Sequence, residues 1–378
     1  MRFLIKQASP ARQVVLELLS QWGQGGLFAD DLLEASDSFR KLSPPDKSLA
    51  HEIFYGVFRH RIYLDFLIDR FASQGIDSLP SVVRDILRMS LYQLRHLSRV
   101  PDYAVVDDAC RLCRQFKQAS WVKVVNGILR HFSRTKKSPP KIPGKPDSPE
   151  HLSTQYSLPK WIIQLFLKEL GLETVRSIGQ WAISQPPLTL WVNTRKVGLD
   201  DLTKQFQDKG YDVLLHPGSP QTLSVFSGIV TELPGYEEGL WQVQDASAQK
   251  VVSLLDVQPG DRVWDCCAAP GGKAIQLAAV LDSSGELYLS DSNPQRAATL
   301  IRNLRRMGIS AVRFWVGDAL HPPLRPDILF DRILLDAPCS GLGVLSRRVD
   351  LRYRVKPEDL PRLAQLQTQL LRSVVTRL

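Results

Sequence analysis

The feature that most constrains this chain is a run of small residues between an apolar segment and an apolar-periodic one. Residues 262–264 predict a strand end, and Asp265 to Lys273 then spell Asp-Cys-Cys-Ala-Ala-Pro-Gly-Gly-Lys. Residues 274–280 follow with apolar side chains at helical spacing. A strand, a tight turn and a helix in this order are how an open α/β sheet binds a nucleotide-like ligand at the carboxyl end of its first strand. Glycines let the backbone approach such a ligand closely.

The same run does not fit two common nucleotide-binding loops. A phosphate-binding loop needs Gly-x-x-x-x-Gly-Lys-Ser/Thr, whereas Lys273 is followed by Ala274 and the position of the first glycine is Cys267. The dinucleotide pattern Gly-x-Gly-x-x-Gly is also absent. An alternative without function is a generic Gly-Gly turn in an α/β domain.

The run resembles the cofactor loop of the S-adenosylmethionine-dependent RNA cytosine-5 methyltransferases. Their pattern is close to Asp-x-Cys-Ala-Ala-Pro-Gly-Gly-Lys-Thr, and only Ala274 departs from it. The resemblance implies S-adenosyl-L-methionine as the cofactor. It also implies that the loop residues bind it: Ala268, Ala269, Pro270, Gly271, Gly272 and Lys273.

Composition narrows the class of protein. The 378 residues carry a net charge of +9 and are 44% hydrophobic, which is ordinary for a soluble chain of two or three domains. No run of about 18 apolar residues occurs, so we expect no membrane span. Five cysteines, an odd number, favour a reducing cytoplasm over a disulfide framework.

The positive charge is concentrated in the first part of the chain, where residues 1–150 hold 23 Lys and Arg against 16 Asp and Glu. This excess predicts a polyanionic partner, nucleic acid first, with a solvated basic surface as the alternative.

Residues 1–135 show only helical periodicity and predict an all-α domain. Ser81 to Leu97 is the clearest helix, because its apolar residues form one stripe. The domain resembles the NusB-like RNA-binding domain in three blocks: Leu79 to Arg88, Leu91 to Leu94 and Val125 to Arg130. That resemblance implies contact with RNA.

A metal site is not predicted. Cys110 and Cys113 lie one helical turn apart in an apolar helix, without a second Cys or His pair nearby. A structural zinc site needs four ligands, so we expect these two side chains to pack in the core.

The middle of the chain predicts a linker and a small α+β module. Residues 136–150 carry five prolines without apolar periodicity and predict a semi-stiff linker. Within residues 151–240, alternating segments predict strands around an amphipathic helix at residues 199–209. In the family named above, a module of this kind precedes the catalytic domain and helps to bind RNA.

Residues 241–378 repeat a βα rhythm and predict a Rossmann-like methyltransferase domain. Asp291 ends the second strand, where a carboxylate can accept both ribose hydroxyls. The alternative for Asp291 is a helix N-cap before Pro294. Asp318 follows the third strand, at the place where this fold takes the adenine amino group.

The fourth strand leads into a second motif, Asp336-Ala-Pro-Cys339-Ser-Gly-Leu-Gly, which matches the family pattern in full. Carbon 5 of cytosine becomes nucleophilic when a thiolate attacks carbon 6. A carboxylic acid near ring nitrogen 3 assists by donating a proton, and Asp336 suits this role as well as cofactor binding. The target base must be unstacked to be reached.

The role of Cys339 has two readings. In DNA cytosine-5 methyltransferases the Pro-Cys cysteine is the nucleophile, whereas in the RNA family the nucleophile usually lies in a later Thr-Cys-Ser-like block. The Pro-Cys cysteine then serves product release. No Thr-Cys pair occurs in the 378 residues. We therefore expect a methyltransferase domain truncated before that block, or a remnant without it. Such a chain would bind cofactor and RNA and transfer methyl groups slowly or not at all, unless Cys339 replaces the missing thiol.

The resemblance spans essentially the whole chain. It implies cytosine-5 methylation of ribosomal RNA, most like the small-subunit enzymes called Sun or Fmu, by a monomer in the cytoplasm. The alternative is a catalytically inactive RNA-binding protein with a remnant methyltransferase domain.

Overall fold

The computed structural model describes residues 7–217, 219–281 and 284–378. The chain divides into two compact units, and each is formed by two stretches of sequence. Unit 1 comprises Met1–Gln185 and Gly341–Pro357, and unit 2 comprises Pro186–Ser340 and Glu358–Leu378. The predicted linear boundaries at residues 135, 150 and 240 remain a prediction.

Unit 1 is all-α, which confirms the helical class predicted for its first part. Its α-helices are α1 (Pro10–Gly23), α2 (Ala29–Ala35), α3 (Asp37–Arg40), α4 (Pro44–Phe71), α5 (Ser81–His96), α6 (Asp102–Gln115), α7 (Val122–Thr135), α8 (Pro149–Tyr156), α9 (Lys160–Leu170) and α10 (Leu172–Ile183). Short 3₁₀ turns are η1 (Ile76–Ser78), η2 (Ala119–Trp121), η4 (Leu342–Val344) and η5 (Leu351–Tyr353).

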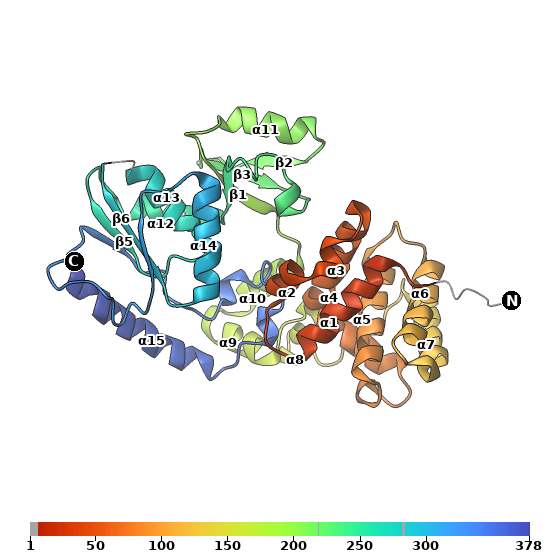
Figure 1. Cartoon of the computed structure of the whole chain (residues 1–378). Coiled ribbons are helices and arrows are strands. Elements are labelled where there is room, and N and C mark those ends of the chain that lie inside the picture. Colours follow the sequence, from red (N-terminus) through yellow and green to blue (C-terminus); the bar gives the residue numbers. More distant parts are fainter. Residues whose placement is uncertain (1–6, 218, 282–283) are drawn as a thin grey trace. The chain divides into compact units, whose positions relative to one another are not determined.

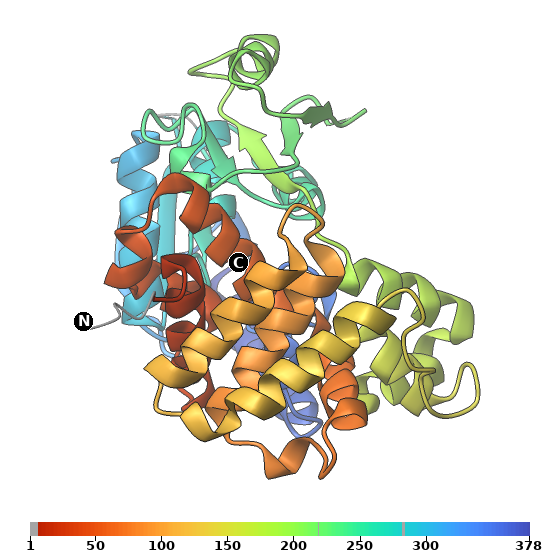
Figure 2. The same cartoon turned by 90° about the vertical axis from the view of Figure 1, so that its right-hand side faces the viewer.

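The long helix α4 organises this unit. It begins where the Ser43 hydroxyl accepts a hydrogen bond from the Asp46 backbone N–H and where Pro44 pre-sets the first helical φ. Helices α1, α5 and α8 pack against it, and α6 and α7 follow α5 (Figures 1 and 2). Phe54 and Phe58 of α4 are fully buried in the shared core. Cys110 and Cys113 are buried as well, in agreement with the packing role predicted for them.

Unit 2 begins with a small α+β module, as predicted. It contains β1 (Leu188–Val192), α11 (Leu199–Asp208), β2 (Val213–Leu215), β3 (Thr222–Val225), η3 (Val230–Glu232) and β4 (Trp241–Val243). The four strands form an antiparallel sheet in the order β2-β3-β1-β4. Trp241 and Phe206 are fully buried between the sheet and α11.

The rest of unit 2 is an α/β domain with a parallel sheet, which confirms the Rossmann-like class. Its elements are α12 (Ala246–Leu254), β5 (Arg262–Asp265), α13 (Gly272–Leu281), β6 (Glu286–Asp291), α14 (Pro294–Met307), β7 (Arg313–Val316), β8 (Arg332–Leu334), α15 (Asp359–Val374) and η6 (Val375–Arg377). The strand order is β7-β6-β5-β8, and all neighbours are parallel.

Strand β5 lies inside this sheet and is covered on both faces. Successive side chains of a strand point to opposite faces, so Val263 packs with α13 and α14 while Trp264 packs with α15. A strand buried on both faces has no polar alternation, which explains why Val263 and Trp264, consecutive residues on opposite faces, are both apolar. The carboxyl ends of β5 and β8 are adjacent, because Asp265 is in register with Leu334.

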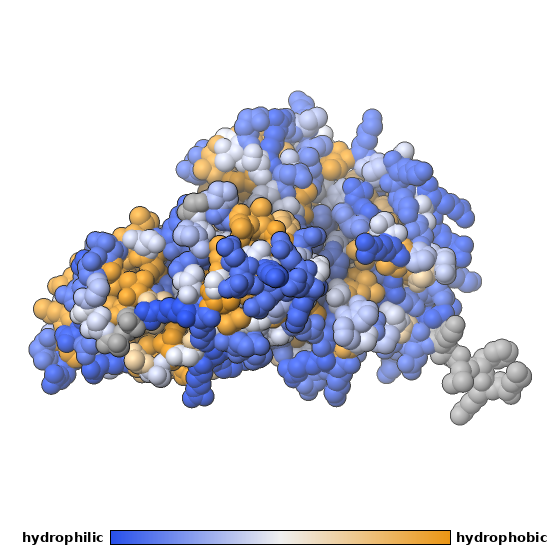
Figure 3. Space-filling model, turned by 90° about the horizontal axis from the view of Figure 1, so that it is seen from above, coloured by the Kyte–Doolittle hydropathy of each residue, from blue (hydrophilic) through white to orange (hydrophobic). Residues whose placement is uncertain are grey.

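The described surface is mixed in polarity. Figure 3 shows one face on which hydrophilic side chains predominate and hydrophobic patches lie between them. Among the described residues, no helix combines the length and the apolar composition that crossing a bilayer would require.

Candidate cofactor site

The loop after β5 is held by both neighbouring strands. The Cys266 backbone N–H donates to the Leu334 carbonyl of β8 at 3.0 Å. The Ala268 N–H donates to the Ser290 carbonyl of β6 at 2.9 Å. The Ala269 N–H donates to the Asp291 carboxylate at 3.1 Å. Residues 266–269 are therefore fixed across the carboxyl edge of the sheet.

One of the two loop glycines is required by its conformation. Gly271 has a φ of +111°, and an added Cβ would stand 2.8 Å from the Leu300 side chain of α14. At Gly272 an added Cβ would meet the Gln244 side chain at an ordinary 3.5 Å. Gly271 thus makes the turn, and Gly272 opens α13.

A cavity of about 140 Å³ lies at this loop. Of the ten predicted site residues, six line it: Ala268, Ala269, Pro270, Gly272, Lys273 and Asp336. Five further lining residues were not predicted as site residues: Val243, Gln244, Ala248, Asp265 and Cys267. Asp265 and Cys267 stand inside the loop motif itself, and Gln244 precedes α12 in the Gln-Asp pair at the domain entry.

Two buried acceptor atoms of this cavity have no hydrogen-bond partner. They are Oδ1 of Asp265 and Oε1 of Gln244, and both side chains are less than a tenth exposed. Burial raises the pKa of Asp265 to about 7. A buried oxygen without a donor is costly. The cavity therefore suits a ligand that brings hydrogen-bond donors, a cationic one above all.

Asp291 supports the loop from the end of β6. It is 2% exposed, its Oδ2 accepts from Ala269 N–H, and its Oδ1 accepts from Asn293 N–H at 3.0 Å. The cap of α14 is Asn293, whose side chain accepts from the Arg296 N–H. The alternative of Asp291 as the N-cap is therefore wrong. Asp291 is not among the cavity-lining residues.

Three other predicted residues, Gly271, Asp318 and Cys339, also lie away from the lining. Asp318 is exposed after β7, and its carboxylate accepts from the Leu320 N–H at 2.9 Å. Cys339 is exposed in the loop after β8.

Asp336, in contrast, joins the loop after β8 to the cavity. Its carboxylate accepts from the Lys273 ammonium at 2.5 Å, and the Asp336 side chain remains 57% exposed.

The cysteines differ in access to solvent. Burial raises the pKa of the Cys267 thiol to about 12 and that of Cys266 further. Burial likewise raises the pKa values of Cys110 and Cys113. All five cysteines are described, and Cys339 alone is exposed. Since a thiolate is the reactive form, Cys339 is the thiol that can meet a substrate from solution.

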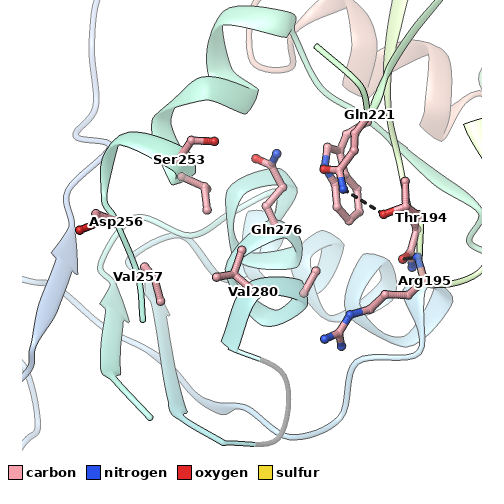
Figure 4. A pocket seen from close by; sticks show the side chains of 12 residues that line it. Thr194, Arg195, Gln221, Ser253, Asp256, Val257, Gln276 and Val280 are labelled. Carbon is pink, nitrogen blue, oxygen red and sulfur yellow. Dashed lines mark hydrogen bonds between the residues drawn. The ribbon is translucent and has the colours of Figure 1, made fainter. Parts of the chain in front are cut away.

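A second cavity of about 250 Å³ lies in the same unit, where the end of β1 faces α12 and α13 (Figure 4). Gln221 donates there to the Thr194 hydroxyl at 2.9 Å. Gln276 lines this cavity and accepts from Gln244 at 2.7 Å, so an amide pair connects the two cavities. Among the described residues, the unpartnered buried side-chain atoms include none from this lining. The unpartnered buried acceptors that a ligand could satisfy therefore lie in the smaller cavity.

The described residues hold no group of three or more His, Cys, Asp or Glu side chains placed to bind a metal ion.

Three family models match the chain. The model for 16S rRNA methyltransferase RsmB/F matches residues 252–378. The model for the NusB family matches residues 9–134. The model for the ferredoxin-like domain of RsmF/B-like methyltransferases matches residues 158–229.

Curated relatives match nearly the whole chain. A protein of Synechocystis sp. named probable ribosomal RNA small subunit methyltransferase B is 34% identical over 367 residues, covering 96% of this chain and 82% of the relative. Ribosomal RNA small subunit methyltransferase B of Klebsiella pneumoniae is 31% identical over 337 residues, covering 89% and 76%.

Two solved structures share the fold. The crystal structure of PH0851 superposes with a TM-score of 0.79 at 22% identity, covering 99% of this chain and 84% of that one. A methyltransferase homologue from Pyrococcus horikoshii has a TM-score of 0.51 at 28% identity, covering 60% and 72%.

Proposed function

The chain belongs to the 16S rRNA methyltransferase RsmB/F family, and we propose that it uses S-adenosylmethionine to methylate carbon 5 of a cytosine in small-subunit ribosomal RNA. In this proposal residues 1–135 and 151–240 contact RNA, residues 136–150 link them, and residues 241–378 hold the cofactor. The excess of Lys and Arg over Asp and Glu in residues 1–150 supports a polyanionic partner.

The observation that carries the proposal is the pair of unpartnered acceptors in the loop cavity. Asp265 Oδ1 and Gln244 Oε1 need donors, and the methionyl ammonium of S-adenosylmethionine is a cationic donor. Ala268, Ala269, Pro270 and Gly272 line the cavity with small residues. When bound there, the cofactor would supply an electrophilic methyl group.

Asp291 is proposed to act at the edge of this site. Each of its oxygens accepts one backbone hydrogen bond, and Oδ2 also lies 3.5 Å from the Arg296 guanidinium. Oδ1, which has one donor, keeps a lone pair for a ribose hydroxyl. Asp318, exposed after β7, is proposed to accept from the adenine amino group.

The residues proposed to act on the base lie in the loop after β8. A thiolate that bonds to carbon 6 makes carbon 5 nucleophilic, and a proton at nitrogen 3 neutralises the charge that develops on the ring. After carbon 5 has taken the methyl group, a base removes its original proton and the bond between sulfur and carbon 6 breaks, which releases the thiolate.

Asp336 is assigned the transfer of the proton to nitrogen 3, because it lines the cavity and is exposed enough to meet a base. Its carboxylate is in contact with the Lys273 ammonium, which would supply the proton that Asp336 passes to nitrogen 3. Cys339, three residues later and exposed, is assigned the release of the product, as the family resemblance implies. No Thr-Cys pair occurs in the 378 residues, so methyl transfer by this chain requires Cys339 to supply the thiolate for carbon 6 as well, and we expect that transfer to be slow.

The cofactor role of Asp291 predicts a measurable loss. In calorimetric titrations, Asp291→Ala should weaken S-adenosylmethionine binding at least tenfold, about 1.4 kcal/mol, the range of a hydrogen bond to a charged group. Asp331→Ala is the matched control, since Asp331 also accepts from a backbone N–H, that of Arg262 at the start of β5. Equal affinities of wild type and Asp291→Ala would remove Asp291 from the site.

A further inference from the structure

The chain changes unit inside the second motif, between Ser340 and Gly341. Residues 336–340 end the first stretch of unit 2, and the next residues, Gly341–Pro357 (the anchor segment), belong to unit 1. The chain returns to unit 2 at Glu358. The loop that carries Asp336 and Cys339 is therefore held at one end by β8 and at the other by the helical unit. In Figures 1 and 2 the blue anchor segment lies among the helices of unit 1.

Arg352 fixes the anchor segment inside the helical unit. Its side chain is 0% exposed and donates to three backbone carbonyls: Ser157 at 3.2 Å, Ala182 at 2.9 Å, and Leu345. Ser157 caps α8, and Ala182 lies in the last turn of α10, where carbonyl dipoles favour a cation. One guanidinium thus joins two helix ends to the start of the anchor segment.

Asp350 and Tyr353 add further bonds on either side of Arg352. The Asp350 carboxylate, 3% exposed, accepts from Trp22 Nε1 at 3.0 Å and from the Ala29 N–H at 2.9 Å. The Tyr353 hydroxyl donates to the Phe58 carbonyl of α4 at 2.7 Å. Val349 is fully buried in the core built around α4. The anchor segment is therefore packed into the core of the helical unit and does not merely lie on its surface.

The junction between loop and anchor segment leaves little freedom. Gly341 has a φ of +68°, and an added Cβ would stand 2.2 Å from the Leu351 side chain. On the unit 2 side, Gln367 of α15 donates to the Pro338 carbonyl at 2.8 Å. A displacement of the helices around Arg352 would be carried along the chain from Gly341 to Cys339, two residues before it, and to Asp336, five residues before it.

We propose that the anchor segment couples RNA binding by the helical unit to the placement of the loop 336–340, with Arg352 as the positioning residue. This inference rests on the proposed function, since it takes RNA as the ligand of the helical unit. Arg352 touches neither cavity and acts through the chain that follows Cys339. RNA held by the helices would then set the geometry of the residues that act on the base.

The exposed thiol of Cys339 allows a test that does not need turnover. The rate of maleimide labelling of Cys339 is measured on the whole chain with and without a small-subunit ribosomal RNA fragment. Tyr353→Phe removes one hydroxyl and keeps the ring, and Arg352→Lys keeps the charge without the planar fork that reaches three carbonyls. Tyr92→Phe is the matched control, because the Tyr92 hydroxyl bonds Glu52 within the same unit and not the anchor segment.

We expect RNA to change the labelling rate in wild type and in Tyr92→Phe, and the change to be lost in both anchor variants at unchanged RNA affinity. Arg352→Lys should also lower kcat about tenfold, with KM for RNA and the affinity for S-adenosylmethionine preserved. An equal RNA effect in anchor variants and wild type, or none in wild type, would overturn the coupling. Absence of methyl transfer together with an anchor-dependent labelling change would instead count against the proposed function alone.

Discussion

Asp336→Asn is expected to lower the rate of methyl transfer to ribosomal RNA by at least about 100-fold, the usual contribution of a positioned acid. The substitution keeps the shape of the side chain and removes the carboxyl group that would pass a proton to nitrogen 3. Asp336 stands at the cavity in contact with the Lys273 ammonium, and Asn keeps one oxygen for this contact. Saturation with cofactor should therefore remain attainable while the chemical step fails.

The measurement is single-turnover transfer of labelled methyl groups at saturating cofactor. Asp37→Asn provides the control, because Asp37 forms an exposed ion pair with Arg40 in the helical unit. A variant Asp336→Asn that transfers as fast as wild type would show that another group serves nitrogen 3.

The second large effect concerns pH. The affinity for S-adenosylmethionine should fall with the ionised fraction of Asp265, by about 50-fold between pH 7 and pH 5. Burial raises the pKa of Asp265 to about 7, so in the free protein this carboxyl is protonated below that pH. The cofactor ammonium needs the carboxylate, and at lower pH binding must first remove the proton.

The effect of Asp265 on the pH dependence of folding stability is opposite to that of an ordinary ion-paired carboxylate, whose pKa is lowered in the folded state. Because the folded pKa of Asp265 lies above its unfolded value, its contribution to stability is complete below the unfolded pKa near 3.8 and is lost as the pH rises to about 7. A bound cation offsets this loss of stability.

The affinity for S-adenosylmethionine is measured by calorimetric titration from pH 5 to pH 7. It should rise with pH in wild type and stay constant in Asp265→Asn. A flat wild-type profile would exclude Asp265 as the partner of the ammonium.

Local motifs predicted most of the fold and part of the site. The run ending in Gly271 and Gly272 predicted the turn between β5 and α13, because a left-handed residue beside a packed helix restricts the residue type. Gln244 could not be found in this way. It reaches the cavity through the packing of α12 and β4 against the loop, which is a tertiary property.

The contacts of the anchor segment likewise could not be predicted from local sequence. Arg352 stands in a polar stretch that predicts surface exposure, yet it is fully buried on backbone carbonyls. Its partners lie 7, 170 and 195 residues away in the chain. Periodicity reports on neighbours within an element and carries no information about such distant acceptors.

Methylation at carbon 5 of cytosine displaces the hydrogen at that atom, so release of tritium from carbon 5 reports the proposed reaction itself. Small-subunit ribosomal RNA labelled with tritium at carbon 5 of its cytosines is incubated with excess protein and S-adenosylmethionine, so that slow transfer is also seen. The account predicts tritium in water, dependent on the cofactor and equal to the methyl groups incorporated. Methyl incorporation without tritium release would place the reaction at another atom. If neither methyl incorporation nor tritium release is seen, the proposed methyl transfer by this chain is contradicted, and the alternative of a non-catalytic RNA-binding protein is favoured.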